Sequence, residues 1–399
     1  MSATATDPAL CANCPRLCRY TCPVAQGTAD EAATPTAMAQ AWRAAKSGTL
    51  AWSDAADVVS RCTGCMACQS PCELEQDVPS YLYAARAQAW TNGAVPDGAQ
   101  HVHKAMLDSG NPFGEDQTKA LRDVATDDDF DRKGRVLFWP GCRALHDQPD
   151  AVAGLMAIFR ALGADHVSLP ARDEVACCGA PLRAIGDAAG FEVSIAAHQQ
   201  YFNRQRTWIT GSGECLNAVR EGYGSTGNAV TAEVLHLAEF LAFFAEQLAD
   251  LGHAAYVQRA EAGLPAPRVV VFDSCGVGRR AGRGEAVYAV LEAALGSRPE
   301  SFAPSPGRTV CCGAGDFHDL RRPAAAAAVA EYAMKHGDAG DAWLVATDSG
   351  CLGSLRAAAG VEVDDLVGFL VKWLGPAVAA GAKASTPLPT GLKAGDAEA

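Results

Sequence analysis

The chain has 399 residues, of which 49% are hydrophobic and 20% are charged, and its formal net charge at pH 7 is −13. A chain of this length and composition is expected to fold into two or three domains with hydrophobic cores. The acidic balance argues against nucleic acid as a partner, because phosphate binding requires a basic face, and no apolar run reaches the ~18 residues that span a bilayer.

The chain contains 16 cysteines, and its N-terminus shows no signal peptide. We therefore expect a reducing, cytoplasmic environment and metal chemistry in place of disulfides. A peripheral position at the inner face of a membrane stays open, through a partner that is itself embedded.

Eight of the cysteines form two quartets between residues 11 and 72, spaced Cys-x2-Cys-x3-Cys-x3-Cys-Pro and Cys-x2-Cys-x2-Cys-x3-Cys. This pattern is typical of bacterial ferredoxins that hold two [4Fe–4S] clusters, in which three ligands come from one loop and the fourth from the other quartet. The crossover predicts two ligand sets: Cys11, Cys14, Cys18 and Cys72 for one cluster, and Cys62, Cys65, Cys68 and Cys22 for the other.

Zinc is a weaker interpretation of the quartets, because zinc sites usually combine two separated Cys-x2-Cys pairs. The quartets depart from the ferredoxin pattern in two places: one extra residue precedes Cys18, and Pro71 precedes Cys72 instead of following it. Both departures change the shape of a loop and leave the number of ligands unchanged.

The segment around the quartets is expected to form an all-α domain over residues 1–90. Residues 1–9 are expected to be a loose tail, and residues 36–57 form one or two short helices packed on the clusters. A helix opened by Pro79 follows over residues 78–90. Residues 91–134 contain turn signals and an acidic run, Asp127 to Asp129 and Asp131, and are interpreted as a connector with a solvated loop.

From Arg135 the pattern changes to alternating strands and helices and occurs twice, over residues 135–262 and 263–375. The expected strands of the first repeat are 136–139, 167–169 and 208–210, and its helices are 149–162, 187–205 and 235–248. The expected strands of the second repeat are 269–272 and 343–347, and its helices are 285–295, 323–335 and 367–374. Residues 376–399 are expected to be a disordered tail.

Each repeat carries a single cysteine, an adjacent pair and another single cysteine. These are Cys142, Cys177, Cys178 and Cys215 in the first repeat, and Cys275, Cys311, Cys312 and Cys351 in the second. Loops after parallel strands meet at one sheet edge, so we expect the four thiols of each repeat to converge, with the two sites facing each other about a local two-fold axis.

The glycine after each adjacent pair is interpreted as letting the backbone approach a bulky inorganic group. Buried structural cysteine is the alternative for each position, but the same order in two copies favours one or two further iron–sulfur clusters. Because two neighbouring cysteines rarely both reach one cubane, one of each pair is allowed to lie outside the ligand set, which would leave an open iron.

The quartets, the Gly110-Asn111-Pro112-Phe113-Gly114 segment and the two Cys-Cys-Gly repeats resemble the cysteine-rich-domain iron–sulfur proteins. This family includes the catalytic subunit of heterodisulfide reductase, the iron–sulfur subunits of glycolate oxidase and anaerobic glycerol-3-phosphate dehydrogenase, and the lactate-utilisation iron–sulfur protein. The resemblance implies an α+β protein: a small all-α ferredoxin-like domain followed by a duplicated α/β, Rossmann-like domain with parallel sheets.

The chain departs from the heterodisulfide reductase pattern at three positions. In that pattern each repeat ends in Cys-x-x-Cys, which gives five thiols for a non-cubane cluster, whereas this chain has Ser212 and Asp348 at the first of these positions. Four thiols suit an ordinary cubane better. A histidine that often follows the first cysteine of the second repeat is replaced by Gly276.

The resemblance implies an electron-transfer subunit that passes electrons between a flavoprotein dehydrogenase, acting on a 2-hydroxy acid or similar small organic donor, and a quinone or other acceptor. A membrane quinone-reactive subunit is a further implied partner. No G-x-G-x-x-G fingerprint follows a strand, so flavin or NAD is expected on another subunit. The alternatives are a disulfide reductase with a substrate-binding cluster in a repeat, and a protein whose clusters are only structural. No residue is assigned a catalytic role.

Overall fold

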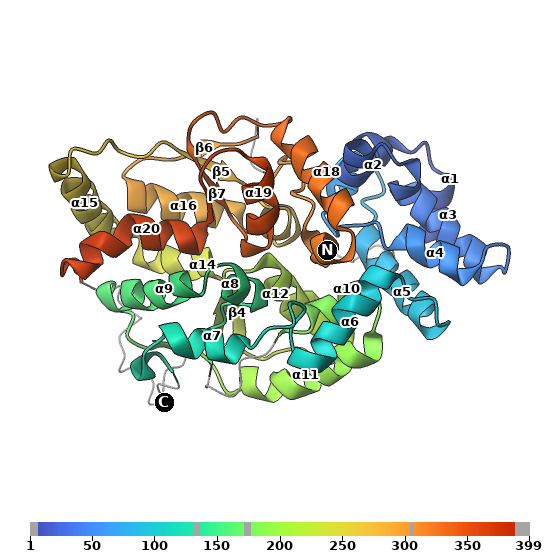
Figure 1. Cartoon of the computed structure of the whole chain (residues 1–399), viewed down its shortest axis with the longest axis horizontal. Coiled ribbons are helices and arrows are strands. Elements are labelled where there is room, and N and C mark those ends of the chain that lie inside the picture. Colours follow the sequence, from blue (N-terminus) through green and yellow to red (C-terminus); the bar gives the residue numbers. More distant parts are fainter. Residues whose placement is uncertain (1–6, 131–135, 171–176, 304–306, 388–399) are drawn as a thin grey trace.

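The computed structural model describes residues 7–130, 136–170, 177–303 and 307–387, and shows a helical N-terminal domain at one end of two α/β repeats (Figure 1). Its helices are α1 (Pro8–Asn13), α2 (Pro23–Thr28), α3 (Pro35–Lys46), α4 (Trp52–Val59) and α5 (Val78–Thr91). Proline opens α1, α2 and α3, where its missing N–H costs nothing and its fixed φ favours a helix. The all-α prediction for this domain is confirmed.

The predicted connector is largely helical, which corrects the sequence interpretation. It contains α6 (Asp97–Ser109) and α7 (Gln117–Val124), and α6 packs against the first-repeat helix α10 (Ala180–Ile185). Turn residues flank these helices, since Pro96 precedes α6 and Gly110 ends it with φ 68°. The turn signals therefore marked the ends of helices instead of a continuous loop.

The acidic run is also less solvated than expected. Asp127–Asp129 form a 3₁₀ turn in which Asp129 is only 2% exposed. Asp129 accepts a hydrogen bond from Thr126 and pairs with Arg160 of the first repeat. A buried carboxylate requires such partners, so this residue anchors the connector to the repeat. Asp131 lies outside the described residues.

Each repeat contains a parallel sheet of four described strands. The first has the order β2-β1-β3-β4 and the second the order β6-β5-β7-β8. The strands of the first sheet are β1 (Val136–Phe138), β2 (Val167–Ser168), β3 (Thr207–Thr210) and β4 (Glu233–His236); those of the second are β5 (Val269–Phe272), β6 (Glu300–Ser301), β7 (Trp343–Ala346) and β8 (Val363–Asp365). The identical strand order confirms the duplicated α/β fold predicted from the sequence.

Three strands, β4, β6 and β8, were not predicted. The expected helix over residues 235–248 begins as strand β4, which pairs with β3, and continues as α14 (Leu237–Leu241) and α15 (Ala245–Glu261). Strand β6 has only two residues, which is too short for a period-two pattern. Pairing with a neighbouring strand determines these segments, and local sequence does not report it.

The two repeats share one hydrophobic core. Helix α9 (Pro149–Ala161) packs against α20 (Leu366–Ala379), and α15 packs against both α16 (Gly284–Leu295) and α20, an arrangement that Figure 1 shows at the end away from the N-terminal helices. The remaining helices of the repeats are α8 (Cys142–Asp147), α11 (Ala188–Phe202), α12 (Gly213–Asn217), α13 (Tyr223–Ser225), α17 (His318–Arg321), α18 (Pro323–Met334) and α19 (Leu352–Ala358). The repeats therefore form one body.

The predicted disordered tail is wrong for its first part. Helix α20 continues to Ala379, and the hydroxyl and amide groups of Ser385 and Thr386 all donate to Asp250. Residues 388–399 lie outside the described residues. Among the described helices, none is both long enough and apolar enough to cross a membrane.

Candidate cluster sites

The first predicted ligand set of the N-terminal domain is gathered in one place. Burial raises the pKa of the Cys18 thiol to about 11. The neighbouring thiols whose charges add to this shift are those of the same predicted set, Cys14, Cys11 and Cys72. Cys14, Cys18 and Cys72 are half-buried, so this set lies near the protein surface.

The second predicted set is also gathered, and it lies deeper. Cys22, Cys62, Cys65 and Cys68 line one cavity together with apolar side chains such as Met38 and Val78. Burial raises the pKa of Cys62 to about 12. The structure thus brings Cys22, from the first quartet, beside the first three cysteines of the second quartet.

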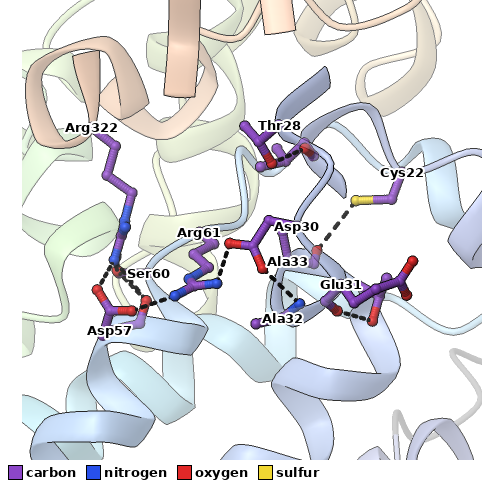
Figure 2. A network of polar contacts seen from close by, with 12 residues as sticks. Cys22, Thr28, Asp30, Glu31, Ala32, Ala33, Asp57, Ser60, Arg61 and Arg322 are labelled. Atoms are coloured by element: carbon purple, nitrogen blue, oxygen red, sulfur yellow. Dashed lines mark hydrogen bonds and ion pairs between the residues drawn. The ribbon is translucent and has the colours of Figure 1, made fainter. Parts of the chain in front are cut away.

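The loop that carries Cys22 is fixed by ion pairs, which Figure 2 shows. The Cys22 thiol donates to the carbonyl of Ala33 at 3.3 Å. Arg61 pairs with both Asp30 and Asp57, and Arg322, which precedes α18 in the second repeat, pairs with Asp57. The second repeat therefore helps to hold the N-terminal domain in place.

The four thiols of the first repeat converge beyond the carboxyl ends of their strands. The Cys177 sulfur lies 3.8 Å from that of Cys142, and the Cys178 sulfur lies 3.3 Å from that of Cys215. Exposed fractions are 5% for Cys142, 2% for Cys177, 1% for Cys178 and 3% for Cys215.

The second repeat repeats this arrangement. The Cys275 and Cys311 sulfurs are 3.8 Å apart, and the Cys312 and Cys351 sulfurs are 2.9 Å apart. In both repeats the adjacent cysteines separate, one toward the first single cysteine and the other toward the last. Both members of each pair thus belong to the buried thiol set, and the geometry sets neither apart as the expected non-ligand.

The donor chemistry of these sets fits iron–sulfur clusters. Buried thiols are soft ligands suited to iron–sulfur clusters, and backbone N–H groups donate to their sulfurs, as Gly64 does to Cys62 at 3.3 Å and Gly313 does to Cys311 at 3.4 Å. In the described part of the chain no three His, Cys, Asp or Glu side chains are spaced to hold a single metal ion.

The glycine of each Cys-Cys-Gly segment has a different role from the one expected. Gly179 and Gly313 have φ of 83° and 90°. A Cβ on Gly313 would lie 2.4 Å from the carbonyl oxygen of Ala326 in α18, and one on Gly179 would lie 2.8 Å from Ser194 in α11. Glycine therefore permits a left-handed turn and close helix packing, and its missing side chain faces a helix instead of the thiols.

This geometry predicts a large difference between two glycine substitutions. We expect Gly313→Ala to lower the free energy of unfolding by about 2–4 kcal/mol, because the new methyl group clashes and the left-handed φ is strained. Gly353→Ala is the control: a Cβ there meets nothing within 4 Å, so the helix should gain about 0.5–1 kcal/mol. Urea unfolding measures both, and equal effects would contradict the packing role.

Ser212 and Asp348, which replace cysteines of the five-thiol pattern, are helix caps. The Ser212 hydroxyl accepts from the Cys215 amide at 3.3 Å. The Asp348 carboxylate accepts from the Gly350 amide at 2.9 Å and, across the repeat interface, from the Gly213 amide at 3.0 Å. These residues position the fourth thiol of each set and join the two strand-end faces.

Gly276 lies at the same interface. Its carbonyl accepts a hydrogen bond from Asn217 of the first repeat at 3.0 Å, and a Cβ on it would lie 2.8 Å from Asp348. A larger side chain at this position would therefore displace the aspartate cap.

The Asn-Pro-Phe segment forms a wall of the first-repeat site. The Asn111 side chain bonds the backbone of its own loop. The Cys177 amide donates to the Gly110 carbonyl at 3.3 Å, and Gln117 donates to the Cys142 carbonyl at 2.6 Å. The motif thus holds the loops of two first-repeat cysteines.

The N-terminal domain contacts the second repeat directly through thiols. Cys65, Cys275 and Cys311 form one buried cluster, and the Cys311 thiol donates to Thr63 at 3.6 Å. A hydrogen bond between the Cys311 and Cys65 thiols, together with burial, raises the pKa of Cys65 well above its usual value. The second N-terminal set and the second-repeat set are therefore neighbours.

A buried ion pair fixes this contact. Arg86 of α5 and Asp316 of the second repeat are 3.0 Å apart, with side chains 3% and 5% exposed. Arg86 also donates to the carbonyl groups of Cys62 and Ala184, so one side chain joins all three parts of the protein. Sequence reasoning missed both residues, since no local pattern distinguishes an arginine that pairs 230 positions away.

A cavity opens in front of the second-repeat thiols. Its lining combines three parts of the fold: Thr63 and Gly64 from the N-terminal domain, Glu214 and Asn217 from the first repeat, and Cys275, Gly276, Arg280, Cys312, Gly315, Asp316, Asp348, Gly350 and Cys351 from the second. The first-repeat thiols instead pack among aromatic side chains, including Trp139, Trp208 and Tyr223. The two thiol sets thus differ in their surroundings.

Comparison with known proteins gives the same division of the chain. A family model described as a cysteine-rich domain, CCG, matches residues 136–220 and again residues 269–356. The chain belongs to the CCG-domain iron–sulfur oxidoreductases. The repeats described above are its two CCG domains.

Three curated relatives align with most of the chain. A heterodisulfide reductase component from Methanosarcina barkeri, of the dihydromethanophenazine:CoB–CoM type, is 25% identical over 70% of this chain and 67% of its own length. Its counterpart from Methanosarcina mazei is 26% identical over 72% and 69%. A protein of Chromohalobacter salexigens named probable membrane-anchored ferredoxin is 28% identical over 65% of this chain and 39% of its own length. The chain is thus an iron–sulfur oxidoreductase subunit.

Proposed function

We propose that the chain is the electron-transfer subunit of an oxidoreductase complex. It would pass electrons between a flavoprotein dehydrogenase, which oxidises a 2-hydroxy acid or similar small organic donor, and a quinone or other acceptor. The observation that carries the proposal is the contact between Cys65 and Cys311, because it joins the N-terminal thiols to those of the second CCG domain.

The proposed cofactors are two [4Fe–4S] clusters on the N-terminal sets and one or two further clusters on the CCG sets. When bound, such clusters supply one-electron transfer at potentials set by charge, hydrogen bonds and burial. The half-buried Cys14, Cys18 and Cys72 make the first N-terminal set the candidate contact with a redox partner. The buried thiols of the CCG domains exclude water from the other end of the path.

Iron analysis of the anaerobically purified protein tests this proposal. We expect about eight irons per chain from the N-terminal sets and about four more for each occupied CCG domain. A redox titration followed by EPR should show reversible steps in the physiological range. Iron without any reversible step would mean that the clusters are only structural, and would sink the electron-transfer role.

The implied partners are a flavoprotein subunit and a subunit embedded in a membrane. The relatives named as subunits of heterodisulfide reductase favour assembly in a complex, and the relative named as a membrane-anchored ferredoxin favours association with a membrane. Isolation from native membranes and cytosol without tags, followed by identification of the copurifying subunits, tests both partners and the predicted cytoplasmic or inner-face location.

A second candidate function is reduction of a disulfide or thiol-linked substrate. It is favoured by the cavity in front of Cys275, Cys312 and Cys351 and by the names of two relatives. Reduced viologen supplied as the electron donor, with a disulfide as acceptor, distinguishes the two functions. Disulfide-dependent oxidation of viologen by the isolated chain would favour this candidate, and its absence alongside reversible redox steps would favour electron transfer alone.

A further inference from the structure

We propose that Arg279 is a positioning residue that couples the second N-terminal thiol set to the second CCG set and raises the reduction potential of the clusters on both. The proposal deepens the proposed electron-transfer function and rests on it, because it requires clusters on these two sets. It concerns one guanidinium that neither the family pattern nor the cysteine spacing brings to attention.

The side chain of Arg279 bridges the two parts of the protein. Its Nε donates to the carbonyl oxygen of Cys65 at 2.9 Å. Its Nη1 donates to the carbonyl oxygens of Thr309 at 2.7 Å and Gly307 at 3.2 Å, in the segment that leads into Cys311. A planar fork of donors with fixed angles is suited to such a bridge, so Arg279 holds the Cys65 loop against the second CCG domain.

The guanidinium is also a positive charge that acts on the thiols at this junction. Burial lowers the pKa of Arg279, but the charges of Cys65, Cys275 and Cys311 outweigh burial, and its pKa is raised. In return, the charge of Arg279 lowers the pKa of both Cys65 and Cys275 against the larger upward effects of burial and thiol hydrogen bonds. The charge therefore acts on both sets.

One donor of Arg279 remains available to a bound group. Its Nη2 is buried and has no hydrogen-bond partner in the described structure. The hydroxyl groups of Ser274, Thr309 and Ser349, which flank Cys275, Cys311 and Cys351 in the sequence, share this condition. A buried polar group without a partner costs about 1–3 kcal/mol, and the sulfur atoms of a cluster would accept from such donors.

The first CCG domain has no equivalent charge at the corresponding position. Arg279 follows Cys275 by four residues, and His146 follows Cys142 by the same number. His146 is turned to the surface, where its side chain is 37% exposed, bonds Glu115 at 3.0 Å and stacks on Phe113. The pseudo-symmetry of the fold is therefore broken at this position in favour of the second domain.

A positive charge stabilises a reduced cluster more than an oxidised one, because reduction adds one negative charge. In the proposed transfer one electron leaves the cluster on the Cys65 set, which is oxidised, and enters the cluster on the Cys311 set, which is reduced. No covalent bond forms or breaks. Arg279 contributes the connection between the two loops and a charge that favours the reduced state on both sides.

Redox titration followed by EPR of the whole purified chain tests the proposal. We expect Arg279→Gln to keep its iron and visible spectrum and to shift the oxidation–reduction equilibrium of the second-domain cluster about tenfold toward the oxidised state, which corresponds to about 59 mV for one electron. The cluster of the Cys65 set should shift in the same direction. Arg298→Gln is the matched control, because it removes the charge of a half-exposed arginine paired with Glu285 on the same domain.

The outcomes separate this proposal from the proposed function. A wild-type protein whose iron comes only from the N-terminal sets overturns both. A third cluster in the wild type, with equal potentials in Arg279→Gln and Arg298→Gln, overturns the role of Arg279 alone. If Arg279→Gln loses iron, Arg279→Lys decides: retained iron with wild-type potentials supports the charge, and lost iron in both variants shows a structural bridge only and overturns the tuning.

Discussion

Replacing Arg86 by methionine should lower the free energy of unfolding by about 3–5 kcal/mol, the largest loss we expect from a single substitution away from the cysteines. The pair of Arg86 and Asp316 is almost fully buried. Burial alone would raise the pKa of Asp316, and Arg86 is the largest of the charges that lower it below its ordinary value. Without Arg86 this carboxylate would lose the largest of its compensating charges.

Two further variants isolate the cause. Arg268 forms an exposed pair with Glu300, so Arg268→Met should cost less than about 1 kcal/mol. The double variant Arg86→Met/Asp316→Asn removes both charges and keeps a side chain that tolerates the φ of 54° at residue 316. We expect it to be more stable than Arg86→Met alone. Urea unfolding followed by circular dichroism measures all three, and equal losses from Arg86→Met and Arg268→Met would contradict the buried-pair argument.

The convergence of the repeat thiols could be predicted because it depends on a general property of parallel sheets. Cys142 follows β1 and Cys215 follows β3, and these two strands are direct neighbours. Any chain with strands in this order brings the two residues to one edge. The same reasoning located Cys275 and Cys351, since β5 and β7 are also neighbours. Local strand signals were sufficient for this part of the site.

The docking of the N-terminal domain could not be predicted, because it depends on pairs far apart in the sequence. Cys65 meets Cys311 only because Arg86, Arg321 and Arg322 bond backbone and side chains of the loop between α4 and Cys62. Each of these arginines resembles a surface residue in the sequence. The Cys-Cys-Gly glycines show a related limit: the pattern revealed that a side chain is excluded, but the excluding group was a helix.

The crossing of ligands between the N-terminal quartets predicts the other large effect. Cys72→Ser should remove about four irons per chain and eliminate one EPR signal, because the structure places Cys72 beside Cys11 and Cys18. The serine oxygen is a harder and weaker ligand for iron–sulfur clusters than a thiolate. The cluster of the other set, whose thiols lie in a separate buried cavity, should keep its signal.

Cys68→Ser is a closely matched control, since Cys68 lies four residues before Cys72 in the same quartet. The thiols whose charges raise the pKa of Cys68, after burial, are chiefly Cys65, Cys62 and Cys22, so its loss should remove the signal that Cys72→Ser leaves intact. Iron analysis and EPR spectra of the two reduced variants decide the assignment. If both variants lose the same signal, the four cysteines of the second quartet bind one cluster by themselves, and the proposed crossing is wrong. If the two losses are complementary, the short sequence distance between Cys68 and Cys72 separates two clusters, because the chain turns between them and directs its last thiol toward the first quartet.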